Sequence, residues 1–344
     1  MHAFARLIRK ALLAGSMAAA VATAPAQAQT KVVVGYQLIV GPFLTAIADG
    51  SFDKAAKEAG YTIDWRQFAS GGEISSALAS GNVPVGVLGS TGITAATTRG
   101  VETELFWILD NIGKSEALVA RNGSGINSPQ DLKGKKVAVP FVSTSHFHLL
   151  VGMENVWKMN PRDVRLLNMK PPEIVAAWQR GDIDAAYVWP PALTEIQKNG
   201  KTIADSEEIG KASVPTFDGI IADKKWAEKN PKFMAAFTQV LAKAYDNYNQ
   251  TKEKWTADSP EVKAMVKLIG GNADDMVSAM KLLVFPTSAE QASKEWLGGG
   301  KDGGALRALT ANADFLQKQK QIDKPLADYS PFVNGTYAAQ AAGK

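Results

Sequence analysis

Hydrophobic and polar residues along this chain form two alternating kinds of segment. Short runs rich in β-branched residues, such as 31–37 and 136–139, are typical of buried strands. Segments of helical composition, such as 43–59 and 173–180, each end at a glycine, which is a common helix stop. This alternation predicts mostly parallel sheets with helices on both faces.

The alternation of strand and helix occurs twice before it gives way to a helical tail. The first unit reaches residue 120, and the next starts at Ser128, where Ser-Pro-Gln-Asp favours the start of a helix. After Ile221 the remaining segments have helical composition. The predicted fold class is therefore α/β, with two α/β units and a helical C-terminal extension.

The N-terminal segment has the pattern of an export signal. Arg6, Arg9 and Lys10 precede an Ala/Leu-rich stretch at 11–24, and Pro-Ala-Gln-Ala-Gln follows it. The apolar stretch is too short for a permanent anchor, and no later segment approaches ~18 consecutive apolar residues. We expect residues 1–28 to be a signal peptide that is cleaved after Ala28, so that the mature protein is periplasmic.

The amino-acid composition excludes several kinds of functional site. The 344 residues include no cysteine, which excludes disulfides, thiolate metal sites, cysteine nucleophiles and a lipid-anchored lipoprotein. The net charge of +4 comes mainly from the leader, which holds three of the 38 basic side chains and none of the 34 acidic ones. The nearly neutral remainder gives no reason to expect nucleic acid as a partner.

Support for catalysis or for a metal site is weak. His146 and His148 are two residues apart on a predicted helix, so they point in different directions and cannot bind one metal ion from the same face. Ser145 and His148 could touch and form a hydrolase dyad, but no nucleophile elbow surrounds them. We expect structural histidines and no cofactor or metal.

Small polar residues follow several predicted strands. Ser90 and Thr91 precede one helix, Thr144 and Ser145 precede another, and Gln37 ends the first strand. In open α/β sheets ligands bind beyond the carboxyl ends of the strands, where helix N–H groups are free. Hydroxyl and N–H groups there suit an anion. The alternative is that the hydroxyl groups only cap their helices.

Aromatic and acidic residues form a second group of candidates. Tyr187 and Trp189 share one face of a predicted strand near its carboxyl end and could contact an ammonium group or a short aliphatic chain, or else pack in the core. Trp178 lies on the same face of its predicted helix as Ile174, four residues earlier, and is expected to pack in the core. Glu116 and Asp218 lie where the chain crosses between the two units, so each could pair with a ligand cation or form a hinge salt bridge.

Several segments between residues 32 and 222 carry a family resemblance. They are VGYQ at 34–37, ALASGN at 77–82 with GS at 89–90, SEAL at 115–118, SPQDLKGKKVAVP at 128–140 with STSH at 143–146, and PPEIVAAWQRGDIDAAYVW at 171–189. Together they resemble periplasmic binding proteins of the taurine/aliphatic-sulfonate type, the soluble components of ABC importers. The segment 171–189 is the most specific and resembles the taurine-binding members.

The resemblance implies a type II periplasmic binding protein fold. Two lobes, residues 29–116 with 220–344 and residues 117–219, would close on a ligand between them. It implies a monomeric, non-enzymatic protein that serves an ABC permease and ATPase complex. Transferred by position, the residues at the sulfonate end are Gln37, Ser90, Thr91, Thr144 and Ser145. Those at the amine end are Tyr187, Trp189 and Asp218, and Glu116 is a further candidate there.

Two segments depart from the family pattern. Taurine-binding members often continue after Tyr-Gln with Thr-Ser-x-Glu-Pro, whereas this chain has LIVGPF at 38–43, and Ser90-Thr91-Gly92 replaces a Ser-Ser-Pro loop.

The leading hypothesis is taurine binding, and the alternative is another alkanesulfonate or small organic acid. A secreted hydrolase using Ser145 and His148 is a remote alternative, and the export signal argues against a pyrimidine-biosynthesis enzyme on the same scaffold.

Overall fold

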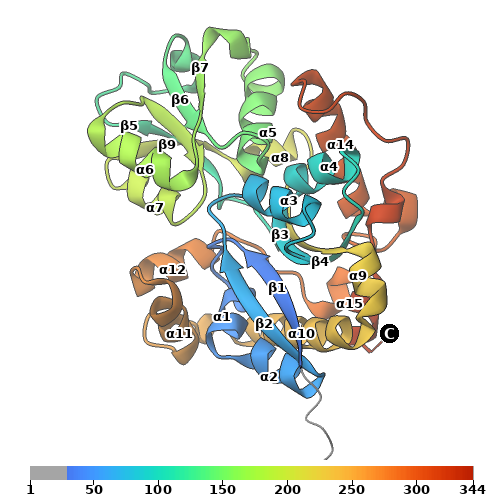
Figure 1. Ribbon diagram of the computed structural model, residues 1–344. Helices are drawn as coiled ribbons and strands as arrows, with labels where there is room; N and C mark the ends of the chain where they lie inside the picture. The colour runs from blue at the N-terminus through green and yellow to red at the C-terminus, as the bar shows by residue number, and fades with distance from the viewer. Residues whose placement is uncertain (1–28, 344) are drawn as a thin grey trace, which may run out of the picture.

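A computed structural model describes residues 29–343, which form two lobes, each built around a five-stranded sheet (Figure 1). The strand order is β2-β1-β3-β10-β4 in the first lobe and β7-β6-β8-β5-β9 in the second. The predicted fold class is confirmed. The predicted signal peptide, residues 1–28, lies outside the described residues.

The first sheet is assembled from the N-terminal strands and one strand that returns from the second lobe. Its strands are β1 (Thr30–Tyr36), β2 (Tyr61–Gln67), β3 (Val85–Gly89), β4 (Thr103–Asn111) and β10 (Phe217–Asp223). β1 pairs in parallel with β2 and β3, whereas β10 runs antiparallel between β3 and β4. β10 already begins at Phe217, ahead of the lobe boundary predicted between residues 219 and 220.

The strands of the second sheet are arranged in the same way as those of the first. Its strands are β5 (Ala117–Arg121), β6 (Lys136–Val139), β7 (Arg165–Asn168), β8 (Ala185–Val188) and β9 (Gly200–Asp205). β6 is parallel to β7 and β8, and β5 is antiparallel to β8 and β9. Both sheets are therefore mixed, because the strands that cross between lobes, β5 and β10, run against their neighbours.

Helices cover both sheets. In the first lobe they are α1 (Pro42–Ala48), α2 (Ser51–Glu58), α3 (Gly71–Ala79) and α4 (Ser90–Thr98), and in the second α5 (Thr144–Val151), α6 (Pro171–Arg180), α7 (Ala192–Gln197) and α8 (Ser206–Lys211). The single helix expected over 43–59 is two helices, because Gly50 adopts a left-handed φ of 77° between them. The helix expected from Ser128 is only a short 3₁₀ turn, Pro129–Leu132.

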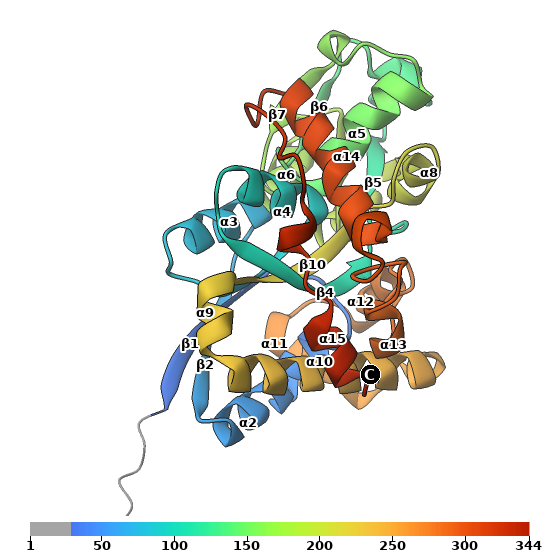
Figure 2. The same ribbon diagram turned by 90° about the vertical axis from the view of Figure 1, so that its right-hand side faces the viewer.

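The predicted helical tail is present and contacts both lobes. It consists of α9 (Lys224–Lys229), α10 (Pro231–Thr251), α11 (Pro260–Ile269), α12 (Ala273–Met280), α13 (Ser288–Gln291), α14 (Gly304–Lys318) and α15 (Thr336–Ala341). α14 packs along α4 of the first lobe and reaches α5 of the second (Figure 2). There the Phe315 ring lies 5.1 Å from Phe147 and 5.6 Å from His146, measured between ring centroids.

None of the helices within residues 29–343 combines the length and the apolar character that crossing a membrane requires.

Candidate ligand-binding site between the lobes

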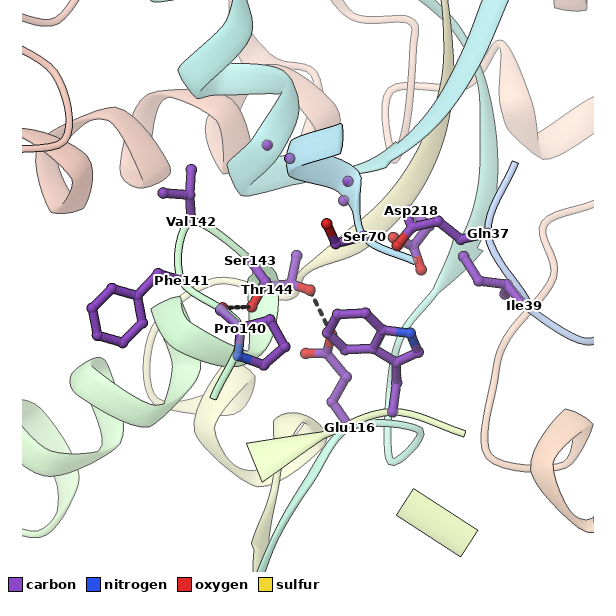
Figure 3. Close-up of a pocket in the computed structure, with 15 residues that line it drawn as sticks. Gln37, Ile39, Ser70, Glu116, Pro140, Phe141, Val142, Ser143, Thr144 and Asp218 are labelled. Carbon is purple, nitrogen blue, oxygen red and sulfur yellow. Dashed lines mark hydrogen bonds between the residues drawn. The ribbon is translucent and has the colours of Figure 1, made fainter. Parts of the chain in front are cut away.

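A cavity lies between the two lobes and is lined by residues from both (Figure 3). In the close-up, Gln37, Ser70 and Asp218 approach it from the first lobe, opposite Thr144 of the second lobe and Glu116 of the first crossing segment. The space open to the centre of a water molecule is ≈ 40 Å³. That is room for about three or four waters at ~10–15 Å³ each, so the cavity suits a small ligand.

Three helices begin at the cavity wall. The residues Gly71 and Gly72 of α3, Gly92 of α4 and Thr144 of α5 all line it, and each lies in the first turn of its helix. The first N–H groups of a helix have no acceptor within the helix, and the helix dipole makes this end positive. Three such ends around one small cavity form an anion site without any basic side chain.

The lobes approach closely beside this cavity. A Cβ atom built on Gly89, at the end of β3, would lie 2.9 Å from Cγ2 of Thr144 and 3.3 Å from Oδ1 of Asp218. Any larger residue would therefore require the Thr144 side chain to shift. Next to this contact, Gln37 donates a hydrogen bond from Nε2 to the Val87 carbonyl at 3.2 Å, which fixes the side-chain amide at the wall.

Three carboxyl groups cluster at the site. Asp218 and Glu116 line the cavity, and Asp110 is fully buried on β4 in register with Asp218. Burial raises the pKa of Asp218 to about 7 and that of Glu116 to about 8, and burial next to these two groups raises the pKa of Asp110 well above its usual value. Within residues 29–343 no basic side chain forms an ion pair with any of them.

Hydroxyl groups surround the Glu116 carboxyl group. Thr144 Oγ1 donates to Oε1 at 2.5 Å and Ser206 Oγ donates to Oε2 at 3.3 Å. The Tyr187 hydroxyl group is hydrogen bonded to Ser206 Oγ at 2.9 Å, and Ser145 lies beside the same carboxyl group. These donors lower the pKa of Glu116 but do not outweigh burial. Glu116 is therefore held in one orientation with its carboxyl group at the cavity wall.

The structure brings five of the nine residues predicted for the site to the cavity. These are Gln37, Glu116, Thr144, Trp189 and Asp218. The hydroxyl groups of Ser90 and Thr91 instead contact the buried side chain of Asn312 on α14, at 3.2 and 2.6 Å. Tyr187 and Ser145 are fully buried behind Glu116. These four residues support the wall from behind.

The two histidines are buried structural residues. His146 stacks on Phe141 with centroids 4.4 Å apart, and His148 Nε2 lies 3.1 Å from the Val214 carbonyl oxygen. Desolvation lowers the pKa of both imidazoles to about 4, so both are neutral near pH 7. In the described part of the chain, His148 makes no hydrogen bond to Ser145, which the hydrolase hypothesis requires.

Sequence reasoning missed part of the wall. Ser70, Gly71 and Gly72 at the start of α3, and Pro140, Phe141 and Val142 before α5, also line the cavity. The segment 140–143 follows β6 just as 89–92 follows β3, so its position at a strand end was a usable signal. The Ser-Gly-Gly sequence at 70–72 follows the edge strand β2, and a Cβ built on Gly71 would lie 3.6 Å from Nε2 of Gln37, so this helix start shares the wall with the end of β1.

One ion pair joins the lobes near this cavity. Lys170 Nζ, before α6 of the second lobe, lies 2.6 Å from Oε1 of Glu73 in the first turn of α3. Both side chains are partly exposed, at 47% and 36%. The Lys170 ammonium lowers the pKa of the Glu73 carboxyl. This pair therefore links α3 of the first lobe directly to the start of α6 in the second.

Comparisons with known proteins identify the family. The family model described as NMT1/THI5 like matches residues 40–253. The taurine-binding periplasmic protein of Escherichia coli (strain K12) is 37% identical over 323 residues, which cover 94% of this chain and 97% of that protein. The periplasmic aliphatic sulphonate binding protein SsuA from Escherichia coli superposes with a TM-score of 0.69 at 21% identity, covering 90% of this chain and 99% of that one.

The same fold also occurs in an enzyme. The desulfurization enzyme DszB superposes with a TM-score of 0.58 at 14% identity, covering 92% of this chain and 99% of that one. At such identities a structural match shows the fold alone, so the family rests on the matched model and on the relative with 37% identity. On both grounds, this chain belongs to the NMT1/THI5-like family, alongside the taurine-binding periplasmic protein of Escherichia coli.

Proposed function

We propose that this protein captures taurine between its lobes and delivers it to the permease and ATPase of an ABC importer. The observation that carries the proposal is the charge pattern of the cavity. Free N–H groups of three helices lie at the wall together with carboxyl groups that no basic side chain within residues 29–343 neutralises. A small zwitterion with one anionic and one cationic end matches that pattern.

The sulfonate end of the ligand is assigned to the helix N-termini. Backbone N–H groups of Gly71, Gly72 and Thr144 are oriented by their helices, and the Gln37 amide lies beside them. No Lys, Arg or His side chain lines this cavity in the part of the chain described. Fixed N–H dipoles suit an anion that must be released again, because they need no charged partner to be stripped of water.

The ammonium end is assigned to Asp218 and Glu116, with Trp189 as the aromatic neighbour. Charge-assisted hydrogen bonds from ammonium to carboxylate are among the stronger ones available to a small ligand, and an indole ring adds attraction for a cation. A ligand with no net charge also avoids the cost of burying an unpaired ion. An alkanesulfonate without an amine would leave the two carboxyl groups uncompensated, so the geometry favours taurine over that alternative.

Closure of the lobes couples capture to transport. A ligand that contacts both lobes stabilises the closed form, and the importer then recognises that form. The protein acts as a monomer in the periplasm after cleavage behind Ala28, and it turns over no substrate. The names of the relatives, which refer to binding of taurine and of aliphatic sulfonates, support this role.

Calorimetric titration of the mature protein with taurine, ethanesulfonate and sulfate tests the proposal. We expect taurine to bind at least about tenfold more tightly than ethanesulfonate, a difference of ~1.4 kcal/mol for one charged contact. Tighter binding of ethanesulfonate would overturn recognition of the amine. Binding of none of the three would overturn the function, and hydrolysis of an ester that Ser145→Ala abolishes would restore the hydrolase hypothesis.

The ion pair between lobes gives a kinetic prediction. Lys170→Met keeps the side-chain stem but removes the partner of Glu73. Exposed pairs contribute ~0.2–1 kcal/mol, so we expect taurine to dissociate up to about fivefold faster, with little change in the association rate. Stopped-flow fluorescence measures both rates.

A matched variant controls for loss of a surface charge. Lys198→Met breaks a pair of the same 2.6 Å length with Glu195, but that pair lies within the second lobe. It is expected to leave both rates unchanged. Equal dissociation rates for Lys170→Met and the wild type would contradict a role of this pair in holding the lobes closed.

A further inference from the structure

A second, smaller cavity adjoins the first at its acidic side. Glu116, Trp189 and Asp218 line both cavities. The two carboxyl groups proposed to hold the ammonium therefore lie where the cavities meet. A nitrogen atom bound between them is at the entrance to the second cavity.

Apart from Ser115, the rest of the second cavity is apolar, and it is narrow. Val40, Ile112 and Leu283 form much of its wall, and each is at most 9% exposed. The space open to the centre of a water molecule is ≈ 20 Å³, which holds about one water or one group of that size, at ~10–15 Å³ each. The aliphatic side chains of this wall suit a methyl group, while the carboxyl groups of Glu116 and Asp218 lie on the side shared with the first cavity.

The bond directions at a tetrahedral nitrogen point a substituent toward this space. With the sulfonate in the first cavity, the carbon chain reaches the nitrogen from that side, and the remaining bonds point away from it. A secondary ammonium keeps two N–H donors, one for each of Asp218 and Glu116, and its methyl group takes the third direction. A quaternary ammonium has no N–H donor and is too bulky for the cavity.

We propose that the second cavity is a subsite for one methyl-sized substituent on the ligand nitrogen. The site then accepts N-monomethylated amino sulfonates together with the unsubstituted amine and excludes quaternary ones. This inference rests on the proposed binding of an amino sulfonate between the lobes. It adds a class of ligand that the carboxyl groups alone do not define. The carboxyl groups select a ligand by its positive charge, whereas the second cavity selects it by the number of methyl groups on its nitrogen.

Calorimetric titration of the mature protein with taurine, N-methyltaurine and N,N,N-trimethyltaurine tests the subsite. We expect N-methyltaurine to bind within about fivefold of taurine, and the trimethyl compound to bind at least about a hundredfold more weakly, because it loses both N–H contacts at ~1.4 kcal/mol or more each.

Two variants that fill the second cavity sharpen the test. Val40→Ile adds one methylene to its wall, and Leu283→Phe fills it more fully; neither residue lines the first cavity. Each is expected to weaken N-methyltaurine at least about tenfold, through overpacking of ~1–3 kcal/mol, and taurine less than about threefold. Val33→Ile, on β1 away from both cavities, is the matched control and should change neither affinity.

The outcomes separate this inference from the proposed function. Wild-type protein that binds taurine but binds N-methyltaurine about a hundredfold more weakly overturns the subsite and leaves the function standing. Folded cavity-filling variants that weaken both ligands equally also overturn it. Absence of binding to taurine overturns the function, and the subsite with it.

Discussion

Asp218→Asn is expected to weaken taurine binding by roughly thirtyfold to several thousandfold. The substitution keeps the shape of the side chain but removes the charge facing the ammonium. Truncating one partner of a buried, hydrogen-bonded charge pair costs ~2–5 kcal/mol, and each ~1.4 kcal/mol is a factor of ten. Unlike Glu116, Asp218 accepts no hydrogen bond from another side chain within residues 29–343, and unlike Asp110 it lines the cavity, so the ligand is its natural partner.

Ethanesulfonate provides the control ligand for Asp218→Asn. It has no ammonium, so its affinity is expected to stay the same or to rise once the carboxyl group is gone. Asp110→Asn is the matched control variant, because Asp110 is fully buried in register with Asp218 but lines neither cavity. Equal losses for taurine and ethanesulfonate would show that Asp218 serves the hinge between the lobes rather than the ligand.

Taurine affinity is expected to fall about a hundredfold between pH 8 and pH 5. Burial raises the pKa of Asp218 to about 7, so below that pH the free protein carries a protonated Asp218. Binding an ammonium then requires loss of one proton, which weakens apparent affinity about tenfold for each pH unit below 7. Titrations in buffers of different ionisation enthalpy measure both the affinity and the number of protons released.

The stability of the ligand-free protein should change in the opposite direction. Asp218 and Glu116 bind protons more tightly when folded than when unfolded, so their contribution to the free energy of unfolding increases as pH falls through 8 and 7 toward 5. Thermal unfolding with and without taurine should therefore show a ligand-induced shift that shrinks on acidification. A taurine affinity that is the same at pH 5 and pH 8 would contradict this account. Asp218→Asn should reduce the pH dependence and leave the part that comes from Glu116.

Residues at strand ends and crossings were the most predictable part of the site. Gln37 and Trp189 follow strands, and Glu116 and Asp218 lie at the two crossings, so the topology of two α/β units brings them to one cleft. This works because the carboxyl ends of parallel strands meet at one edge of a sheet. The positions of these four residues relative to the predicted strands were enough to predict that they meet at the cleft, without knowledge of side-chain packing.

The hydroxyl groups were harder to place. Ser90 and Thr91 lie at a helix start, as predicted, yet their side chains contact Asn312, more than two hundred residues later in the sequence. Likewise Thr144 Oγ1 contacts Glu116, so its assignment to the sulfonate end now rests on its backbone N–H group. A serine or threonine at a helix start has several rotamers, and the tertiary neighbours select among them.

The sequence by itself predicted the export leader, and it determined the absence of thiol chemistry, the two α/β units with their helical tail, and the acidic residues at the crossings. These follow from composition and local periodicity, which act over a few residues. Only the tertiary structure decided which groups face the cavity, that Asp110 joins the carboxyl cluster, and that a second small cavity adjoins it. Those features depend on desolvation and close packing between segments far apart in the chain, and a carboxyl group acquires its raised pKa only when folding removes it from water.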